Sequence, residues 1–279
     1  MDNKKRTALQ AAAALVQNAD LKGLFTGSIY KGPLKSVCVP GLNCYSCPGA
    51  IGSCPVGALQ NSLSSLSFRL PYYVLGLLLF FASLMGRLVC GFLCPFGLLQ
   101  DLLHRLSFPK KIRTFKGDMA LRKVKYAVLL FFVILLPLTV KLTPFFCKYL
   151  CPSGTLSGIL LALSDTTLFS LMGSRFAWKA FILAAVLLLS LLLHRPFCKY
   201  LCPLGAFYGL FNKVSLFRIL QDPQSCIGCG ACARVCEMGI DPSKTPNHTE
   251  CIRCTACITA CSQKALRLGI EKGNKKQST

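Results

Sequence analysis

The heptad FCKYLCP occurs twice in this chain, at residues 146–152 and again at residues 197–203. Each copy follows a long apolar run, and its last cysteine is followed by a proline and, two residues later, by a glycine. A third, looser copy reads VCGFLCPFG at residues 89–97. Repeated cysteine pairs at the ends of the most apolar segments indicate a bound group there, because packing alone gives no reason for identical spacings.

The composition is that of a membrane protein. Of the 279 residues, 53% are apolar and only 15% are charged, although the net charge is +22. Eight Lys and Arg residues lie within 104–125, between two apolar runs. That pattern is typical of a cytoplasmic loop. We therefore attribute the positive charge to membrane topology and expect no nucleic-acid partner.

Three segments have the length and apolarity of transmembrane helices, at residues 71–89, 124–143 and 176–194. Pro137 lies inside the second segment, where we expect a kink because membrane helices tolerate proline.

Residues 7–29 are a fourth candidate span, although they contain Asn18 and Asp20. A signal peptide is the alternative, and we favour an uncleaved span. Residues 155–173 carry Asp165, and we interpret them as a surface or re-entrant helix.

The expected fold is mainly α. Residues 1–215 would form a polytopic, tandem-duplicated membrane helical bundle of about four spans in the cytoplasmic (inner) membrane. The charge pattern places residues 216–270 in the cytoplasm, as a small α+β ferredoxin-like domain followed by a basic tail at 271–279. The two FCKYLCP copies would then lie on opposite faces of the membrane. The proline in each CP pair suits the first position of a helix, whose amide end favours a thiolate-bound cluster.

The last quarter of the chain contains two runs of the form CxxCxxCxxxC, at residues 226–236 and 251–261. This is the pattern of a two-cluster bacterial ferredoxin, in which the fourth cysteine of each run ligates the other [4Fe–4S] cluster. The proline that usually follows the fourth cysteine is replaced by Glu237 and Ser262. Zinc seldom uses this spacing. The predicted ligands are Cys226, Cys229, Cys232 and Cys261 for the first cluster and Cys251, Cys254, Cys257 and Cys236 for the second.

Four further cysteines lie at the inner ends of two predicted membrane helices, which is enough for a third [4Fe–4S] cluster. The alternative is that they are small apolar residues capping membrane helices. The two identical spacings favour a cluster. We call these residues the inner set: Cys90, Cys94, Cys198 and Cys202.

On the outer side, six cysteines are available for four ligand positions. Disulfides are the alternative there, because the outer compartment can be oxidising. Another bound group is a further alternative, and Cys38 is interpreted as a spare residue. The outer set predicted to hold a cluster is Cys54, Cys147 and Cys151, with Cys47 or Cys44 as the fourth ligand.

The [4Fe–4S] clusters would thus number two in the tail and up to four in all. A haem is not expected, because the three histidines, His104, His194 and His248, are not paired within the spans. A quinone near His194 and Arg195 is one interpretation of that pair, and an interfacial anchor is the other. No nucleotide-binding glycine loop occurs.

These residues resemble a family, the polytopic iron–sulfur membrane proteins typified by NapH and by the membrane portion of NosR. The resemblance covers about residues 65–265 and rests on VCGFLCP, FCKYLCP and the double ferredoxin motif. It implies an electron relay across the membrane, between a quinol or cytoplasmic donor and an exported oxidoreductase.

The chain departs from that family in two ways. It has three CxxxCP copies, where NapH-like chains are recognised by two, and it adds a cysteine-rich segment at residues 38–60. The departures put a quinol donor in doubt and suit an outer partner such as a flavoprotein or another redox protein.

The sequence therefore predicts a transmembrane electron conduit, with redox protein partners on both faces, that acts as an electron-transfer subunit of an oxidoreductase system. Two alternatives remain open. One is the membrane subunit of a quinol dehydrogenase that feeds an exported reductase, and the other is a redox-sensing or assembly factor.

Overall fold

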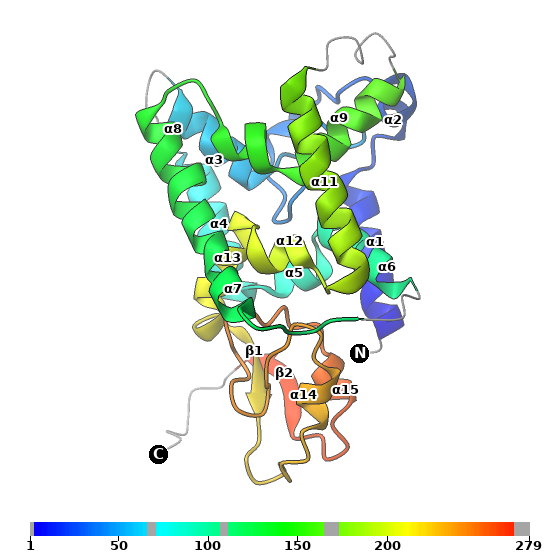
Figure 1. The fold of residues 1–279 in the computed structure, drawn as a ribbon, viewed down its shortest axis with the longest axis vertical. Coiled ribbons are helices and arrows are strands. Elements are labelled where there is room, and N and C mark those ends of the chain that lie inside the picture. The colour runs from blue at the N-terminus through cyan, green and yellow to red at the C-terminus, as the bar shows by residue number, and fades with distance from the viewer. Residues whose placement is uncertain (1–2, 66–70, 107–110, 165–172, 271–279) are drawn as a thin grey trace.

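The computed structural model describes residues 3–65, 71–106, 111–164 and 173–270. The chain is mainly helical, and in these ranges it has one two-stranded sheet. The molecule is elongated, with its elements in three tiers along the long axis (Figure 1). The expected basic tail at 271–279 lies outside the described residues.

The lower tier is the ferredoxin-like domain. Its strands pair antiparallel, with Phe217 opposite Ile270 and Gln221 opposite Leu266, so the first and last segments of the domain lie side by side. Two short helices pack beside this ribbon (Figure 1). The elements are β1 (Phe217–Gln221), α14 (Ala231–Val235), α15 (Ala256–Thr259) and β2 (Leu266–Ile270).

The middle and upper tiers share one local feature, a helix that starts directly after a cysteine. Four helices begin at the proline of a cysteine–proline pair, as predicted. Proline has no backbone N–H, and at the first position of a helix this costs nothing, because an N–H there would have no partner within the helix. In the middle tier they are α6 (Pro95–Arg105) and α13 (Pro203–Leu210), and in the upper tier α3 (Pro55–Ser64) and α9 (Pro152–Ser164).

Short helical segments lead into these turns or link the tiers. They are η1 (Pro33–Ser36), α5 (Leu88–Phe92), η3 (Phe146–Leu150), α12 (Pro196–Tyr200) and η4 (Phe211–Lys213). The two FCKYLCP copies consequently lie in η3 and α12. The interpretation of 155–173 as a surface or re-entrant helix stays a prediction, since residues 165–172 lie outside the described residues.

Two flanks of helices run along the long axis of the upper two tiers (Figure 1). One flank is α11 (Ser174–Leu192), and it is the one helix among the described residues that is long and apolar enough to cross a membrane. Its bounds agree with the predicted span at 176–194. The opposite flank holds α4 (Tyr72–Met85), α7 (Asp118–Ala127), η2 (Val128–Leu135) and α8 (Leu136–Thr139).

The predicted span at 71–89 is wrong at its C-terminal end, because α4 stops at Met85. Gly86 follows with φ 54°, a left-handed conformation that ends the helix. A Cβ on Gly86 would also lie 2.7 Å from Oδ1 of Asn212. The helix therefore has 14 residues and a length of about 21 Å.

The predicted span at 124–143 is distributed over three consecutive elements. Backbone angles stay helical from α7 through η2 into α8, but η2 has the wider π-helical hydrogen-bond pattern. Pro137 lies at the start of α8. A kink is expected at this proline, because it cannot donate a backbone hydrogen bond. The π-helical segment, which departs from regular α-helical hydrogen bonding, comes directly before it.

The prediction of one helix over residues 7–29 is wrong. The segment folds as α1 (Asn3–Gln17) and α2 (Leu21–Thr26), separated by a turn in which Asp20 accepts a 3.1 Å hydrogen bond from the Gly23 amide. Helix α1 also buries polar side chains. Gln10 and Gln17 donate to the carbonyl oxygens of Cys94 and Leu93 at 3.0 and 2.8 Å. These polar contacts explain why an apolarity profile misjudges the segment.

Candidate metal centres

The four cysteine–proline turns hold their thiols in one way. In the inner set, the Gly205 amide donates to Sγ of Cys202 at 3.3 Å. The corresponding glycine amide, three residues after the cysteine, donates at the other three turns. Such amides stabilise a negative sulfur at a helix N-terminus. The pairs are Cys54–Gly57, Cys94–Gly97, Cys151–Gly154 and Cys202–Gly205.

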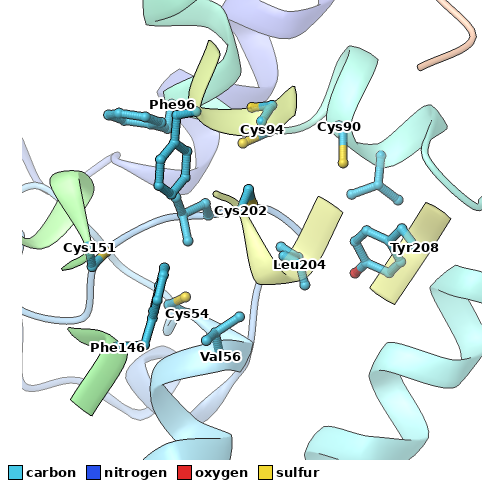
Figure 2. Packing of buried hydrophobic residues seen from close by; sticks show 14 of the residues in the cluster. Cys54, Val56, Cys90, Cys94, Phe96, Phe146, Cys151, Cys202, Leu204 and Tyr208 are labelled. Atoms are coloured by element: carbon cyan, nitrogen blue, oxygen red, sulfur yellow. The ribbon is translucent and has the colours of Figure 1, made fainter. Parts of the chain in front are cut away.

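The structure brings the inner set together. Its four side chains are buried, and the thiol of Cys202 lies close enough to the other three to interact with each electrostatically. Figure 2 shows Cys90, Cys94 and Cys202 in one packed core.

Two arginines that are fully buried flank the inner set in a reciprocal arrangement. Arg87 lies three residues before Cys90 and donates to the Cys198 carbonyl at 3.2 Å. Arg195 lies three residues before Cys198 and donates to the Cys90 carbonyl. The interpretation of Arg195 as an interfacial anchor is therefore wrong, because its guanidinium lies in the core.

Each arginine has its own carboxylate. Arg195 makes two 2.6 Å hydrogen bonds with Asp101 of α6. Arg87 lies 2.8 Å from Glu250, which the ferredoxin-like domain supplies and to which Lys125 also donates at 2.6 Å. A buried charge is tolerated only when it is paired and hydrogen-bonded in this manner.

Two glutamines support the cysteine turns. Gln100 donates to Sγ of Cys198 at 3.3 Å and accepts from the Phe197 amide at 3.2 Å. Gln60 accepts from the Cys147 amide at 3.2 Å. Sequence reasoning missed both roles, although the shared pattern CPVGALQ and CPFGLLQ places each glutamine six residues after its cysteine.

The structure also brings the three principal cysteines of the outer set together, and Cys44 lies with them. Cys44, Cys54, Cys147 and Cys151 line one cavity of about 620 Å³. Cys147 interacts electrostatically with the other three thiols.

Lys179 lines the same cavity and interacts with Cys147 and Cys151. Cys47 does not line it, and neither does Cys38, whose backbone bridges to Ser53.

None of the cysteines is paired with another. All eighteen lie within the described residues and all are free thiols, so the disulfide alternative for the outer side has no support in the structure.

The tail brings its two predicted sets together as well. The first set, Cys226, Cys229, Cys232 and Cys261, lines one small cavity. In the second set, Cys257 interacts with the thiols of Cys251, Cys254 and Cys236.

Burial raises the pKa of Cys251 and of Cys257 to about 12. For these two thiols to act as ligands, the bound metal has to take the place of the proton. Across the described part of the chain, however, no three His, Cys, Asp or Glu side chains lie close enough to share a single metal ion.

Two histidines that are far apart in the sequence lie side by side next to the ferredoxin-like domain. The rings of His104 and His194 pack edge to face with centroids 5.3 Å apart. His194 Nε2 lies 3.1 Å from Asp101, and both rings lie within 3.6 Å of Glu237. These residues and Cys254 line a cavity of about 350 Å³.

Comparison with known proteins gives the nature of the bound group. The family described as 4Fe-4S binding domain matches residues 66–116, 124–166 and 175–221, which together make about half of the chain. The chain belongs to this family. A second 4Fe-4S binding domain family matches residues 219–240. The protein accordingly binds [4Fe–4S] clusters, as its cysteine pattern predicted, and the residues described above fit such clusters by donor type.

Several characterised and uncharacterised proteins are similar in sequence. An uncharacterized protein of Methanocaldococcus jannaschii is 32% identical over 66% of this chain and 72% of its own length. YccM of Escherichia coli, whose name assigns it to electron transport, is 30% identical over 77% of this chain and 62% of its own length. The regulatory protein NosR of Pseudomonas aeruginosa is 32% identical over 62% of this chain and 24% of its own length. No solved structure matches.

Proposed function

We propose that this protein carries electrons across the cytoplasmic membrane, between a cytoplasmic redox partner and an external one, by means of [4Fe–4S] clusters in its four cysteine sets. When bound, such clusters supply one-electron transfer at potentials set by their surroundings. The similarity to YccM supports a role in electron transport.

The observation that carries the proposal is the continuity of the core. One hydrophobic cluster of buried residues contains Cys54 and Cys151 of the outer set and all four cysteines of the inner set. Cys236 and Cys254 of the second tail set pack against the same cluster. Cysteines from three tiers thus belong to or pack against one hydrophobic core.

Tyr208 connects the inner and outer sets. This fully buried ring interacts electrostatically with Cys54 as well as with Cys90, Cys94 and Cys202, and its hydroxyl donates to the Pro40 carbonyl at 3.0 Å. The tail packs closely against the inner set on the other side, since a Cβ on Gly91 would lie 2.5 Å from the Ile252 carbonyl oxygen.

The helix surfaces support a membrane location. Large apolar side chains are exposed on both flanks, including Phe80 of α4, Phe131 of η2 and Phe181 of α11. Exposed apolar surface on this scale marks contact with lipid or protein. Besides α11, the helical run from Asp118 to Thr139 has 22 residues, a length of about 33 Å.

The basic loop and the tail lie on the same side. Arg113 donates to the Arg234 carbonyl, and Arg122 donates to the Met238 carbonyl at 2.9 Å. Because basic loops stay in the cytoplasm, the contact favours a cytoplasmic ferredoxin-like domain.

The deciding experiment uses the full chain, purified without oxygen and reconstituted into liposomes that enclose a soluble electron acceptor. Reductant added outside should reduce the enclosed acceptor, and Cys198→Ser should abolish that transfer. Iron and acid-labile sulfide should each be about 16 per chain. A wild-type chain with full iron content but no transfer across the bilayer would contradict the proposal. About 8 irons would leave only the tail loaded.

A second candidate function is the membrane subunit of a quinol dehydrogenase. The observation that favours it is the cavity of about 350 Å³ lined by His104, His194 and Cys254, where proton-binding side chains lie beside a predicted cluster ligand. Reduction of the clusters by added quinol, and its loss in His194→Phe, would support this candidate. Clusters that quinol leaves oxidised would exclude it.

A further inference from the structure

The two halves of the inner site have the same residue spacing. Residues 87–97 read RLVCGFLCPFG and residues 195–205 read RPFCKYLCPLG, so arginine, two cysteines, proline and glycine recur at equal intervals. In each half the glycine faces the arginine of the other half. A Cβ on Gly97 would lie 3.1 Å from Nη1 of Arg195, and one on Gly205 would lie 3.5 Å from Nη2 of Arg87.

The symmetry does not extend to the counter-ions of the two arginines. Seven residues after the second cysteine, the first half has Asp101, which pairs with Arg195. The second half has Gly209 there, and a Cβ at that position would lie 3.0 Å from the Thr249 carbonyl oxygen. The ferredoxin-like domain occupies the vacated space and supplies Glu250 to Arg87.

Arg87 thereby touches both sides of the junction. Its Nη2 donates to the Cys198 carbonyl in the inner set. Its Nη1 donates at 2.8 Å to the Thr249 carbonyl and to Glu250, which immediately precedes Cys251 of the second tail set. The side chains of Arg87 and Lys125 are completely buried, and that of Glu250 is 3% exposed.

We propose that Arg87 is a positioning residue that joins the ferredoxin-like domain to the inner set, and that Glu250, by docking against Arg87, sets the charge beside the inner set and hence its reduction potential. This inference rests on the proposed function, since it assumes that the inner set holds a cluster.

The sign of the effect follows from electrostatics. Reduction adds a negative charge to the bound cluster, so a buried positive charge nearby favours the reduced form and raises the potential. Glu250 offsets part of the charge of Arg87. Loss of Glu250 should therefore raise the potential of the inner cluster, and loss of Arg87 should lower it.

Symmetry supplies the controls. Arg195→Gln should lower the potential as Arg87→Gln does, because both arginines flank the same four cysteines. Of the two arginine variants, Arg87→Gln alone should also loosen the ferredoxin-like domain, because Arg195 is paired inside the membrane part with Asp101. The effect of Glu250→Gln should be measured in a Lys125→Met background. Loss of a proton from Lys125 would otherwise cancel the change in charge beside the inner set.

The experiment is a redox titration of the full chain, followed by electron paramagnetic resonance, together with hydrogen exchange of residues 247–255. We expect opposite shifts of the inner-cluster potential in Arg87→Gln and Glu250→Gln. We also expect exchange in residues 247–255 to quicken by roughly tenfold or more in both of these variants, but not in Arg195→Gln. Should Arg87→Gln lose iron, Arg87→Lys keeps the charge and should keep the potential while still loosening the domain.

Two results would overturn the inference, and they are distinguishable. Variants with full iron content and unchanged inner-cluster potentials would refute the role of Arg87 and Glu250 and leave the electron conduit intact. A wild-type chain with about 8 irons would remove the inner cluster, and with it both the inference and the proposed function.

Discussion

At Cys94 the glycine that donates to the sulfur, Gly97, also leaves room for the guanidinium of Arg195. This double role predicts a steep cost for Gly97→Ala. Its Cβ would lie 3.1 Å from Nη1 of Arg195 and 3.2 Å from the Cys90 carbonyl oxygen, and both groups are fixed by buried hydrogen bonds. We expect the variant to lose about four irons per chain.

Gly76→Ala is the matched control for that substitution. Gly76 lies in helix α4 with nothing within 4 Å of its added Cβ. Alanine there should stabilise the helix by about 0.5–1 kcal/mol and leave the iron content unchanged. Equal iron content in the two variants would show that the space beside Gly97 does not matter.

The outer set gives a second prediction at this scale. Cys44 lines the outer cavity with three other thiols and Cys47 does not, so Cys44→Ser should lower the iron content by about four per chain. Cys47→Ser should have little effect. Iron analysis of the two variants tests the assignment, and the reverse pattern would make Cys47 the ligand.

Asp118 gives a pH-dependent prediction. Burial alone would raise the pKa of this carboxyl, but hydrogen bonds from Arg122, Tyr200 and Lys199 outweigh burial and hold the pKa below its usual value. A carboxyl with a depressed pKa stabilises the folded state above its unfolded pKa of about 3.9, and that stabilisation is lost as the pH falls through the folded value.

The test compares thermal unfolding of wild type and Asp118→Asn between pH 3 and 7. The wild type should be more stable by about 1.5–3 kcal/mol at pH 5 to 7, because hydrogen bonds to a charged group are lost in the variant. The difference should shrink below pH 4. A difference that is constant with pH would mean that the charge of Asp118 contributes nothing.

At the scale of elements, the exposed face of α11 separates a membrane protein from a soluble one. The side chain of Phe181 is 66% exposed. In water, Phe181→Lys would change stability by about 0.5 kcal/mol or less, whereas in a bilayer it would cost about 2.5–3.5 kcal/mol. We expect the variant to reduce membrane insertion, measured as protein recovered in the membrane fraction.

Ile270→Lys is the control for that variant. Ile270 is 51% exposed at the end of β2 in the ferredoxin-like domain, so lysine there should leave insertion unchanged. If Phe181→Lys behaves like Ile270→Lys, then α11 is not in contact with lipid.

The cysteine spacing indicated which thiols lie together. Proline after Cys94 or Cys202 marks the start of a helix, and the cysteine before it therefore lies at that helix's N-terminus. Helix ends were less accessible. Helix α4 ends at Gly86, and the next amide, that of Arg87, donates to Asn212, which lies 125 residues away in sequence. Similarly, the polar residues of α1 are buried against Leu93 and Cys94, and hydropathy cannot register such partners.

At the scale of the whole molecule, the charged residues were the main surprise. Arg87 lies within the predicted span at 71–89, and Arg195 ends an apolar segment and was therefore interpreted as an interfacial anchor. Their partners, Glu250 and Asp101, lie 163 and 94 residues away, so no local pattern reveals that both guanidiniums lie beside the inner set. The identical spacing of arginine to cysteine in the two halves was the one available signal.

The glycine at position 209 has a consequence for biosynthesis. A ribosome makes Asp101 before Arg195, so that arginine meets its counter-ion as soon as it emerges. Arg87, in contrast, is made 163 residues before its partner Glu250. The surroundings of Arg87 can therefore close only after the segment that carries Glu250 has been translated, and a chain cut before residue 250 would leave this arginine without its counter-ion.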